Sequence, residues 1–113
     1  MAITAQDLDR RITIERETEA GRDEVNEPVL EWTALATVWA RRRDASDGER
    51  EAAGQVGSTL MSRFVVRSSS VTRAVTPVDR LNYSGAIWNI LGVKEADEGR
   101  NRFIEITAIK DAD

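Results

Sequence analysis

The chain has 113 residues, of which 41% are hydrophobic and 32% are charged, and its formal net charge is -4. This size and composition predict one globular domain over residues 1–113 with one modest core. No apolar run approaches the roughly 18 residues of a membrane helix, and the start of the chain lacks the features of a secretory signal, so we expect a soluble intracellular protein with no membrane partner.

The chain contains neither cysteine nor histidine. Their absence excludes disulfides, thiolate and imidazole metal ligands, and the commonest general base near neutral pH. The serines, lysines and carboxylates form no pattern typical of nucleophilic or acid-base catalysis. We therefore expect that the protein is not an enzyme and that it has neither a cofactor nor a metal site.

The acidic balance also bears on nucleic acids. Nonspecific affinity for the phosphate backbone comes from clustered lysine and arginine, so a protein that wraps DNA is not favoured. An acidic wall past which DNA moves without sticking is compatible with this composition.

The first elements are predicted to be a strand and a loop. Residues 8–16 form a short strand, because Ile12 and Ile14 alternate with polar residues. Leu8 is expected to close one end of the core. Residues 18–28 are polar and contain a glycine and a proline, which predicts a surface loop.

Residues 29–41 combine two short alternating segments with a middle that suits a bend. We predict a strand over 29–32, a bend through 34–36 and a second strand over 37–41.

Residues 41–57 are charged and rich in glycine, with Val56 as the one large aliphatic residue. A connection this long contributes little to a core and usually serves a function in a compact domain. Ser46 or Asp47 is suited to cap a short helix that ends at Ala53. We therefore predict a protruding arm with room for a short helix.

The second half of the chain reads as further strands. A strand is predicted over 58–67, a turn at 68–70 and a short extended piece over 71–75. An antiparallel meander follows over 80–109, because its three apolar runs alternate with period two and are separated by turns at 83–85 and 97–101. About six strands in all predict an all-β fold, a small closed or nearly closed antiparallel β-barrel with one long protruding loop.

The three tryptophans are expected to have different environments. Trp88 lies in the meander and is predicted to pack in the core. Trp39 precedes the arm and is expected at a subunit contact, where tryptophan is enriched. Stacking platforms for single-stranded nucleic acid sit in basic grooves, and this composition does not favour one.

A succession of short motifs runs through nearly the whole chain. They are Arg11-Ile-Thr-Ile14, Val38-Trp39-Ala40 before the arm, Phe64-Val-Val-Arg67 after it, Tyr83-Ser-Gly85 with Trp88-Asn-Ile90, and a closing strand over 104–108. In their order and spacing they resemble the head-tail joining proteins of tailed bacteriophages, also called head-closure or stopper proteins. Prophages and gene transfer agents carry similar proteins. The chain departs from the pattern at Asp7, where such proteins often have glycine.

The resemblance implies a β-barrel subunit of the virion neck, made in the bacterial host cytoplasm. It would assemble with itself in a sixfold or twelvefold ring. Portal or adaptor proteins would bind on the head side, and the tail terminator or tail tube on the tail side. The ring would close the channel after packaging, and DNA would be only a cargo that passes through it.

If the resemblance holds, the contact residues lie in the arm, in the 18–28 loop and at Trp39. The basic run at 41–43 is followed closely by acidic residues, which favours a solvated or partner-facing segment over direct contact with DNA. The candidate contact residues are Arg41, Arg42, Arg43, Asp44, Asp47, Glu49, Arg50, Glu51, Arg22, Asp23 and Trp39.

Two other functions stay open. A tail-terminator or tail-tube protein is also small, β-rich and ring-forming. A stand-alone barrel that binds nucleic acid or a peptide is the alternative from another class, and steeply salt-dependent binding to single-stranded DNA would identify it.

Overall fold

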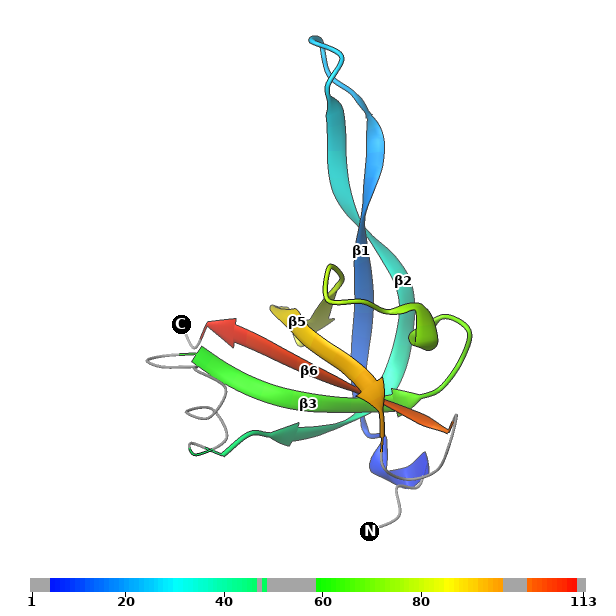
Figure 1. The fold of residues 1–113 in the computed structure, drawn as a ribbon, viewed down its shortest axis with the longest axis vertical. Helices are drawn as coiled ribbons and strands as arrows, with labels where there is room; N and C mark the ends of the chain where they lie inside the picture. The colour runs from blue at the N-terminus through cyan, green and yellow to red at the C-terminus, as the bar shows by residue number, and fades with distance from the viewer. Residues whose placement is uncertain (1–4, 47, 49–58, 97–101, 112–113) are drawn as a thin grey trace.

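The computed structural model describes residues 5–46, 48, 59–96 and 102–111. The strands are β1 (Arg10–Arg22), β2 (Pro28–Asp44), β3 (Thr59–Arg67), β4 (Arg80–Tyr83), β5 (Ala86–Glu95) and β6 (Phe103–Asp111). Two short 3-10 helices, η1 (Ala5–Asp7) and η2 (Thr72–Ala74), lie before β1 and between β3 and β4. All strand pairs are antiparallel. The strands form one closed barrel in the order β1-β2-β3-β6-β5-β4 (Figure 1), so the predicted all-β class is confirmed.

The core fills the inside of the barrel. Alternate residues of each strand point inward, as the period of a pleated strand requires. The buried cluster consists of Ile12, Ile14, Ala40, Phe64, Val66, Val75, Leu81, Trp88, Ile90, Ile104, Ile106 and Ala108. Trp88 is 1% exposed and packs edge-on against Phe64, with ring centroids 5.4 Å apart, so its predicted core position is confirmed.

Leu8 packs outside the main core, contrary to the prediction that it closes one end. It lies with Val65, Ala96 and Phe103 in a second, smaller cluster. Because Phe64 and Val66 point into the barrel, Val65 between them points outward, and the Leu8 cluster covers that outer face of β3.

The prediction of a surface loop over residues 18–28 is wrong. β1 continues to Arg22 and β2 begins at Pro28, so only residues 23–27 connect them. Figure 1 shows the two strands continuing beyond the barrel as a long two-stranded hairpin, and the molecule measures 54 Å along its longest axis. Residues 17–34 are all exposed, so this hairpin contributes almost nothing to the core.

The bend predicted over 34–36 is a β-bulge inside one continuous strand. Ile14 is paired with Ala36 and Glu15 with Ala34, which leaves Leu35 as the extra residue of β2. A bulge bends a strand and increases its twist without ending it. The two predicted strands are therefore the two halves of β2.

β2 also extends past the predicted start of the arm. Ala40 to Asp44 are paired with Val66 to Ser62 of β3, so residues 41–44 belong to the barrel wall. The helix predicted from Ser46 or Asp47 to Ala53 lies mainly outside the described residues.

Two smaller predictions have opposite outcomes. The turn at 83–85 is confirmed: Tyr83 is paired with Ala86, and the residues between them, Ser84 and Gly85, have φ of 54° and 80°, as a type I′ hairpin turn requires. The piece predicted as extended over 71–75 instead contains η2. The Thr72 hydroxyl donates to the Arg67 carbonyl (2.7 Å) and accepts from the Ser69 amide (2.7 Å), which winds this segment into a turn.

Candidate interaction surfaces

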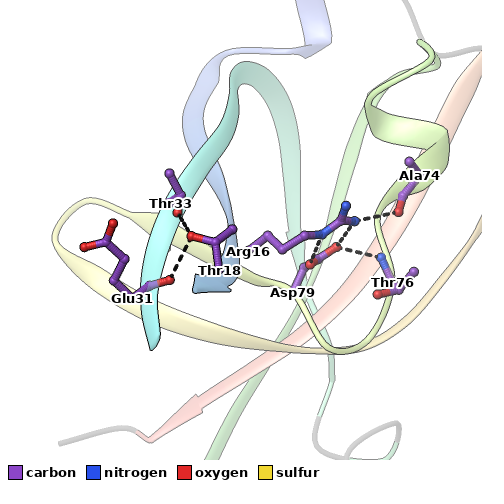
Figure 2. A network of polar contacts seen from close by, with 7 residues as sticks. All are labelled: Arg16, Thr18, Glu31, Thr33, Ala74, Thr76 and Asp79. Atoms are coloured by element: carbon purple, nitrogen blue, oxygen red, sulfur yellow. Dashed lines mark hydrogen bonds and ion pairs between the residues drawn. The ribbon is translucent and has the colours of Figure 1, made fainter. Parts of the chain in front are cut away.

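The stem of the hairpin is fastened to the barrel by a buried carboxylate (Figure 2). Arg16 of β1 donates from Nε and Nη2 to the two carboxylate oxygens of Asp79, at 2.9 and 3.0 Å, and from Nη2 to the Ala74 carbonyl at 3.0 Å. The Thr76 amide also donates to Asp79 (2.9 Å). The Asp79 side chain has no exposed surface, while that of Arg16 is 37% exposed. A bidentate pair of this kind fixes direction as well as distance, so the hairpin leaves the barrel at a defined angle.

A second contact holds the other strand of the hairpin. Arg80, at the start of β4, donates to Glu15 of β1 at 2.7 Å. Its guanidinium also lies 4.1 Å from the centroid of the Trp32 ring of β2. Both side chains of the Arg80–Glu15 pair are largely buried. The two strands are therefore both attached to the loop and strand that follow η2.

Burial alone would raise the pKa of Asp79, but the hydrogen bonds from Arg16 and from the Thr76 amide outweigh it and lower that pKa. A carboxylate with a depressed pKa in the folded state contributes stability above its unfolded pKa of about 3.9, and this stability is lost as the pH falls through the folded value. We expect Asp79→Asn to lower the free energy of unfolding by about 1–2 kcal/mol at pH 7, a figure that allows for the partial exposure of Arg16.

The difference in the free energy of unfolding between the Asp79→Asn variant and the unmodified protein should become smaller below about pH 4. Urea unfolding from pH 7 to pH 3 measures it. Asp9→Asn is the matched control, because the Asp9 side chain is 69% exposed and its carboxylate lies 3.8 Å from the Arg10 guanidinium. An equal loss in both variants, or a difference that stays constant with pH, would contradict the assignment.

The tip of the hairpin is built by Asp23. Its Oδ1 accepts from the amides of Val25 (3.0 Å) and Glu27 (2.9 Å). Asn26 has φ of 64°, and its carbonyl accepts from Arg22 Nη1 at 2.9 Å. These local bonds replace the strand ladder at the turn. The predicted contact residues Arg22 and Asp23 thus lie at the apex and shape it.

The hairpin accounts for the net negative charge of the whole chain. Residues 18–31 contain five carboxylates (Glu19, Asp23, Glu24, Glu27 and Glu31) and one guanidinium (Arg22). That excess equals the net charge of the chain, -4, so the remaining residues are balanced. Val25 at the apex is 73% exposed and Leu30 is 55% exposed. The hairpin therefore presents negative charge together with exposed apolar side chains.

A pocket of about 570 Å³ opens on the outside of the barrel, on the face of β1, β2 and β3. It is lined by Leu8, Arg11, Thr37, Val38, Trp39, Arg67, Ser69 and Thr72. Trp39 is 50% exposed, and the Arg11 guanidinium lies 4.9 Å from its ring centroid. Within the described part of the chain, neither Arg11 nor Arg67 forms an ion pair. We call this the Trp39 pocket.

The start of the predicted arm has a structural role. Arg42 lies 5.2 Å from the centroid of the Trp88 ring and donates from Nε to Asp44 at 2.8 Å. Asp44 also accepts from the Ser62 hydroxyl at 2.8 Å. Although burial raises the pKa of Asp44, the bonds from Ser62 and Arg42 lower it overall. Arg42 and Asp44 thus cover one end of the barrel core.

The predicted contact residues fall into separate regions. Arg22 and Asp23 lie at the hairpin tip, Trp39 lies in the pocket, and residues 41–44 lie in β2. Asp47, Glu49, Arg50 and Glu51 lie outside the described residues. Four residues that position the hairpin could not be recognised from the sequence, because the partners are far apart in the chain: Arg16, Asp79, Glu15 and Arg80. Arg11 and Arg67 were not predicted to line a pocket, although each belongs to one of the short motifs, Arg11-Ile-Thr-Ile14 and Phe64-Val-Val-Arg67.

Neither a metal centre nor a membrane helix is found in the part of the chain that the structure describes. No three carboxylates there are grouped to hold a metal ion. No helix there is long and apolar enough to cross a membrane. Among the described residues, the acidic hairpin presents negative charge beside exposed apolar side chains, and the Trp39 pocket presents two guanidiniums beside a half-exposed tryptophan.

Comparisons with known proteins agree across nearly the whole chain. Residues 3–111 match the model of a family described as phage head completion protein. A chain in a structure of the virion of a native gene transfer agent particle is 28% identical and has a TM-score of 0.64, with 92% of this chain and 94% of that chain covered. Protein SF1141 from Shigella flexneri 2a, solved in solution, is 25% identical and has a TM-score of 0.68, with 94% and 95% covered. No curated protein matches the sequence.

Proposed function

The chain belongs to the phage head completion protein family, and from this premise we propose that it is a structural subunit of the head-tail junction of a tailed phage or gene transfer agent particle. The observation that carries the proposal is the match over residues 3–111, which covers nearly the whole chain. The similar chain from a gene transfer agent virion, covered over 94% of its length, supports the same role.

In this role the chain forms a ring with copies of itself between the portal or adaptor proteins and the tail. The ring closes the head after DNA packaging and offers the surface on which the tail docks. DNA passes through as cargo, and the function requires no catalysis. The arm residues Asp47, Glu49, Arg50 and Glu51 stay candidate contacts to these neighbours on the grounds of the sequence.

The structure suits a subunit that contacts several neighbours. The hairpin, anchored by Arg16 and Asp79, extends on one side of the barrel, while β2 ends at Asp44, where Arg42 and Asp44 cover one end of the core. These separate elements allow one small barrel to bind different partners at the same time. In a ring the two neighbours of a subunit necessarily contact different surfaces.

Deleting the gene for this chain from the genome that encodes the particle tests the proposal. We expect packaged heads and tails of normal length that fail to join, and purified protein added to the lysate should restore joining, as counted by electron microscopy and infectious or transducing titre. Tails of abnormal length would instead identify a tail terminator. Normal joined particles in the deletion strain would overturn the proposal.

A further inference from the structure

We propose that the acidic hairpin tip of one copy docks into the Trp39 pocket of the next copy. This inference rests on the proposed function, because it names the contact by which neighbouring subunits of the junction recognise one another. The occupant of the pocket is a second copy of this chain.

The pocket has the chemistry of a receptor for an acidic segment. Two guanidiniums, from Arg11 and Arg67, line it and form no ion pair within the described residues. Arginine is suited to bind carboxylates, because its planar donor group can make two parallel hydrogen bonds. Trp39, which is half exposed, adds the large apolar contact that dominates many interfaces.

The hairpin has the complementary chemistry. Glu24 and Glu27 flank Val25 at the apex, and the segment 18–31 carries the net negative charge of the whole chain. Val25 is the most exposed of the large hydrophobic side chains at the tip and in the adjacent strand, at 73% against 55% for Leu30 and 44% for Val29. An apolar side chain between two carboxylates matches a tryptophan between two guanidiniums, and such complementarity gives specificity and favours encounter.

The contact has to form between two copies. Pro28 and Trp39 lie in the same continuous strand, β2. At the rise of an extended strand they are roughly 30 Å or more apart, and the stem contacts of Arg16 and Arg80 hold the hairpin in its direction away from the barrel. The tip therefore does not reach the pocket of its own chain.

A tip and a pocket at different places on one subunit make a head-to-tail contact. Each copy gives its hairpin to one neighbour and receives a hairpin from the other. Such contacts repeat until the rotation closes into a ring. The stiff stem then has a purpose, because the angle at which the hairpin leaves the barrel would set the rotation between neighbours.

Two variants with opposite charge changes test the docking. The first has Arg11→Glu and Arg67→Glu, which make the pocket acidic, and the second has Glu24→Lys and Glu27→Lys, which make the tip basic. All four side chains are exposed, so both variants should keep the unfolding midpoint of the unmodified protein. Each variant alone should self-associate about tenfold or more weaker, because like charges then face each other.

Mixing the two variants should restore association. In the mixture an acidic tip meets a basic pocket and a basic tip meets an acidic pocket, so alternating copies are attractive at every contact. Sedimentation of each variant and of the equimolar mixture measures this, and the restored association should weaken with added salt. A mixture that associates no better than either variant would overturn the docking.

Cross-linking provides a direct geometric test, because the natural chain has no cysteine. A variant with Val25→Cys and Thr37→Cys, assembled in particles and oxidised, should give a ladder of linked subunits on a denaturing gel. A variant with Val78→Cys and Thr37→Cys is the matched control, because Val78 is equally exposed, at 76%, but lies outside the hairpin. It should give no ladder.

These results separate the docking from the proposed function. Particles that contain the Val25→Cys, Thr37→Cys protein and give no ladder would overturn the docking and leave head completion intact. A ladder from purified protein, together with normal head-tail joining in the deletion strain, would support the docking and overturn the function. Both variants individually joining heads to tails at normal yield would also count against the docking.

Discussion

A chain in which residues 18–31 are replaced by an Asn-Gly turn is expected to fold into a stable barrel that no longer completes heads. Glu17 and Trp32 are direct cross-strand partners, so a two-residue turn can join them. The removed residues are all exposed, and the contacts of Arg16 with Asp79 and of Arg80 with Trp32 are retained. Thermal unfolding should change little, while the yield of joined particles should fall to the level of the deletion strain.

A full-length hairpin with neutral charge is the matched control for this truncation. Changing Glu19, Glu24, Glu27 and Glu31 to glutamine keeps the reach of the hairpin and leaves Asp23 to form the turn. An intermediate yield would mean that length and charge both contribute. A truncated chain that completes heads normally would show that the hairpin is not a contact element, and one that fails to fold would show that it belongs to the core.

Trp88→Ala is expected to have the largest effect on stability. Trp88 is 1% exposed, packs against Phe64 and lies beneath the cations of Arg42 and Lys110. Removing a large buried aromatic side chain typically costs about 3–5 kcal/mol, and small domains are commonly stable by about 5–15 kcal/mol. Urea unfolding should therefore show a midpoint that is strongly lowered, or a chain that is partly unfolded without denaturant.

Two controls define what Trp88 contributes. The Trp88 Nε1 atom is buried and has no hydrogen-bond partner among the residues that the structure describes. Trp88→Phe therefore removes an unsatisfied donor while it keeps an aromatic ring, and it should lower the free energy of unfolding much less than Trp88→Ala does. Trp39→Ala should leave the unfolding midpoint nearly unchanged, because that ring is half exposed, yet weaken self-association. Equal losses of stability at Trp39 and Trp88 would contradict this division.

The barrel was predictable from the sequence because burial leaves a period-two pattern. Ile12 and Ile14 in β1 and the apolar runs of β5 and β6 alternate between the core and the outside, and Ser84-Gly85 is a turn with a strong local preference. The family resemblance rested on the same strands. Where one face of a strand is buried and apolar, as in β5, β6 and the barrel half of β1, sequence and structure agree.

The hairpin was missed because both of its faces are exposed. Nothing in residues 18–28 has to be apolar, and Gly21 and Pro28 are typical of loops. In the structure Gly21 follows a register shift and has φ of 146°, while Pro28 is the first residue of β2, positions that suit these residue types within strands. The alternation of Leu30 and Trp32 is the available signal, but on its own it predicts only a short, separate strand.

The anchoring contacts and the pocket could not be predicted from local patterns. Arg16 and Asp79 are 63 positions apart in the sequence, and Glu15 and Arg80 are 65 apart. No spacing rule connects such residues before the register of β1 and β4 is known. The Trp39 pocket likewise joins Leu8, residues from three strands and residues from the turn after β3, and no local pattern in the sequence brings these together.

The way β1 and β2 enter the barrel has a mechanical consequence. Each strand runs without a break from the hairpin into the wall, where β1 pairs with β4 and β2 pairs with β3. A pull on the tip along the hairpin would therefore load these backbone hydrogen bonds in shear, several at once, with the Arg16–Asp79 and Arg80–Glu15 ion pairs acting in parallel. A ladder loaded in this way does not open one bond at a time, so tension between neighbouring molecules would spread through the whole barrel.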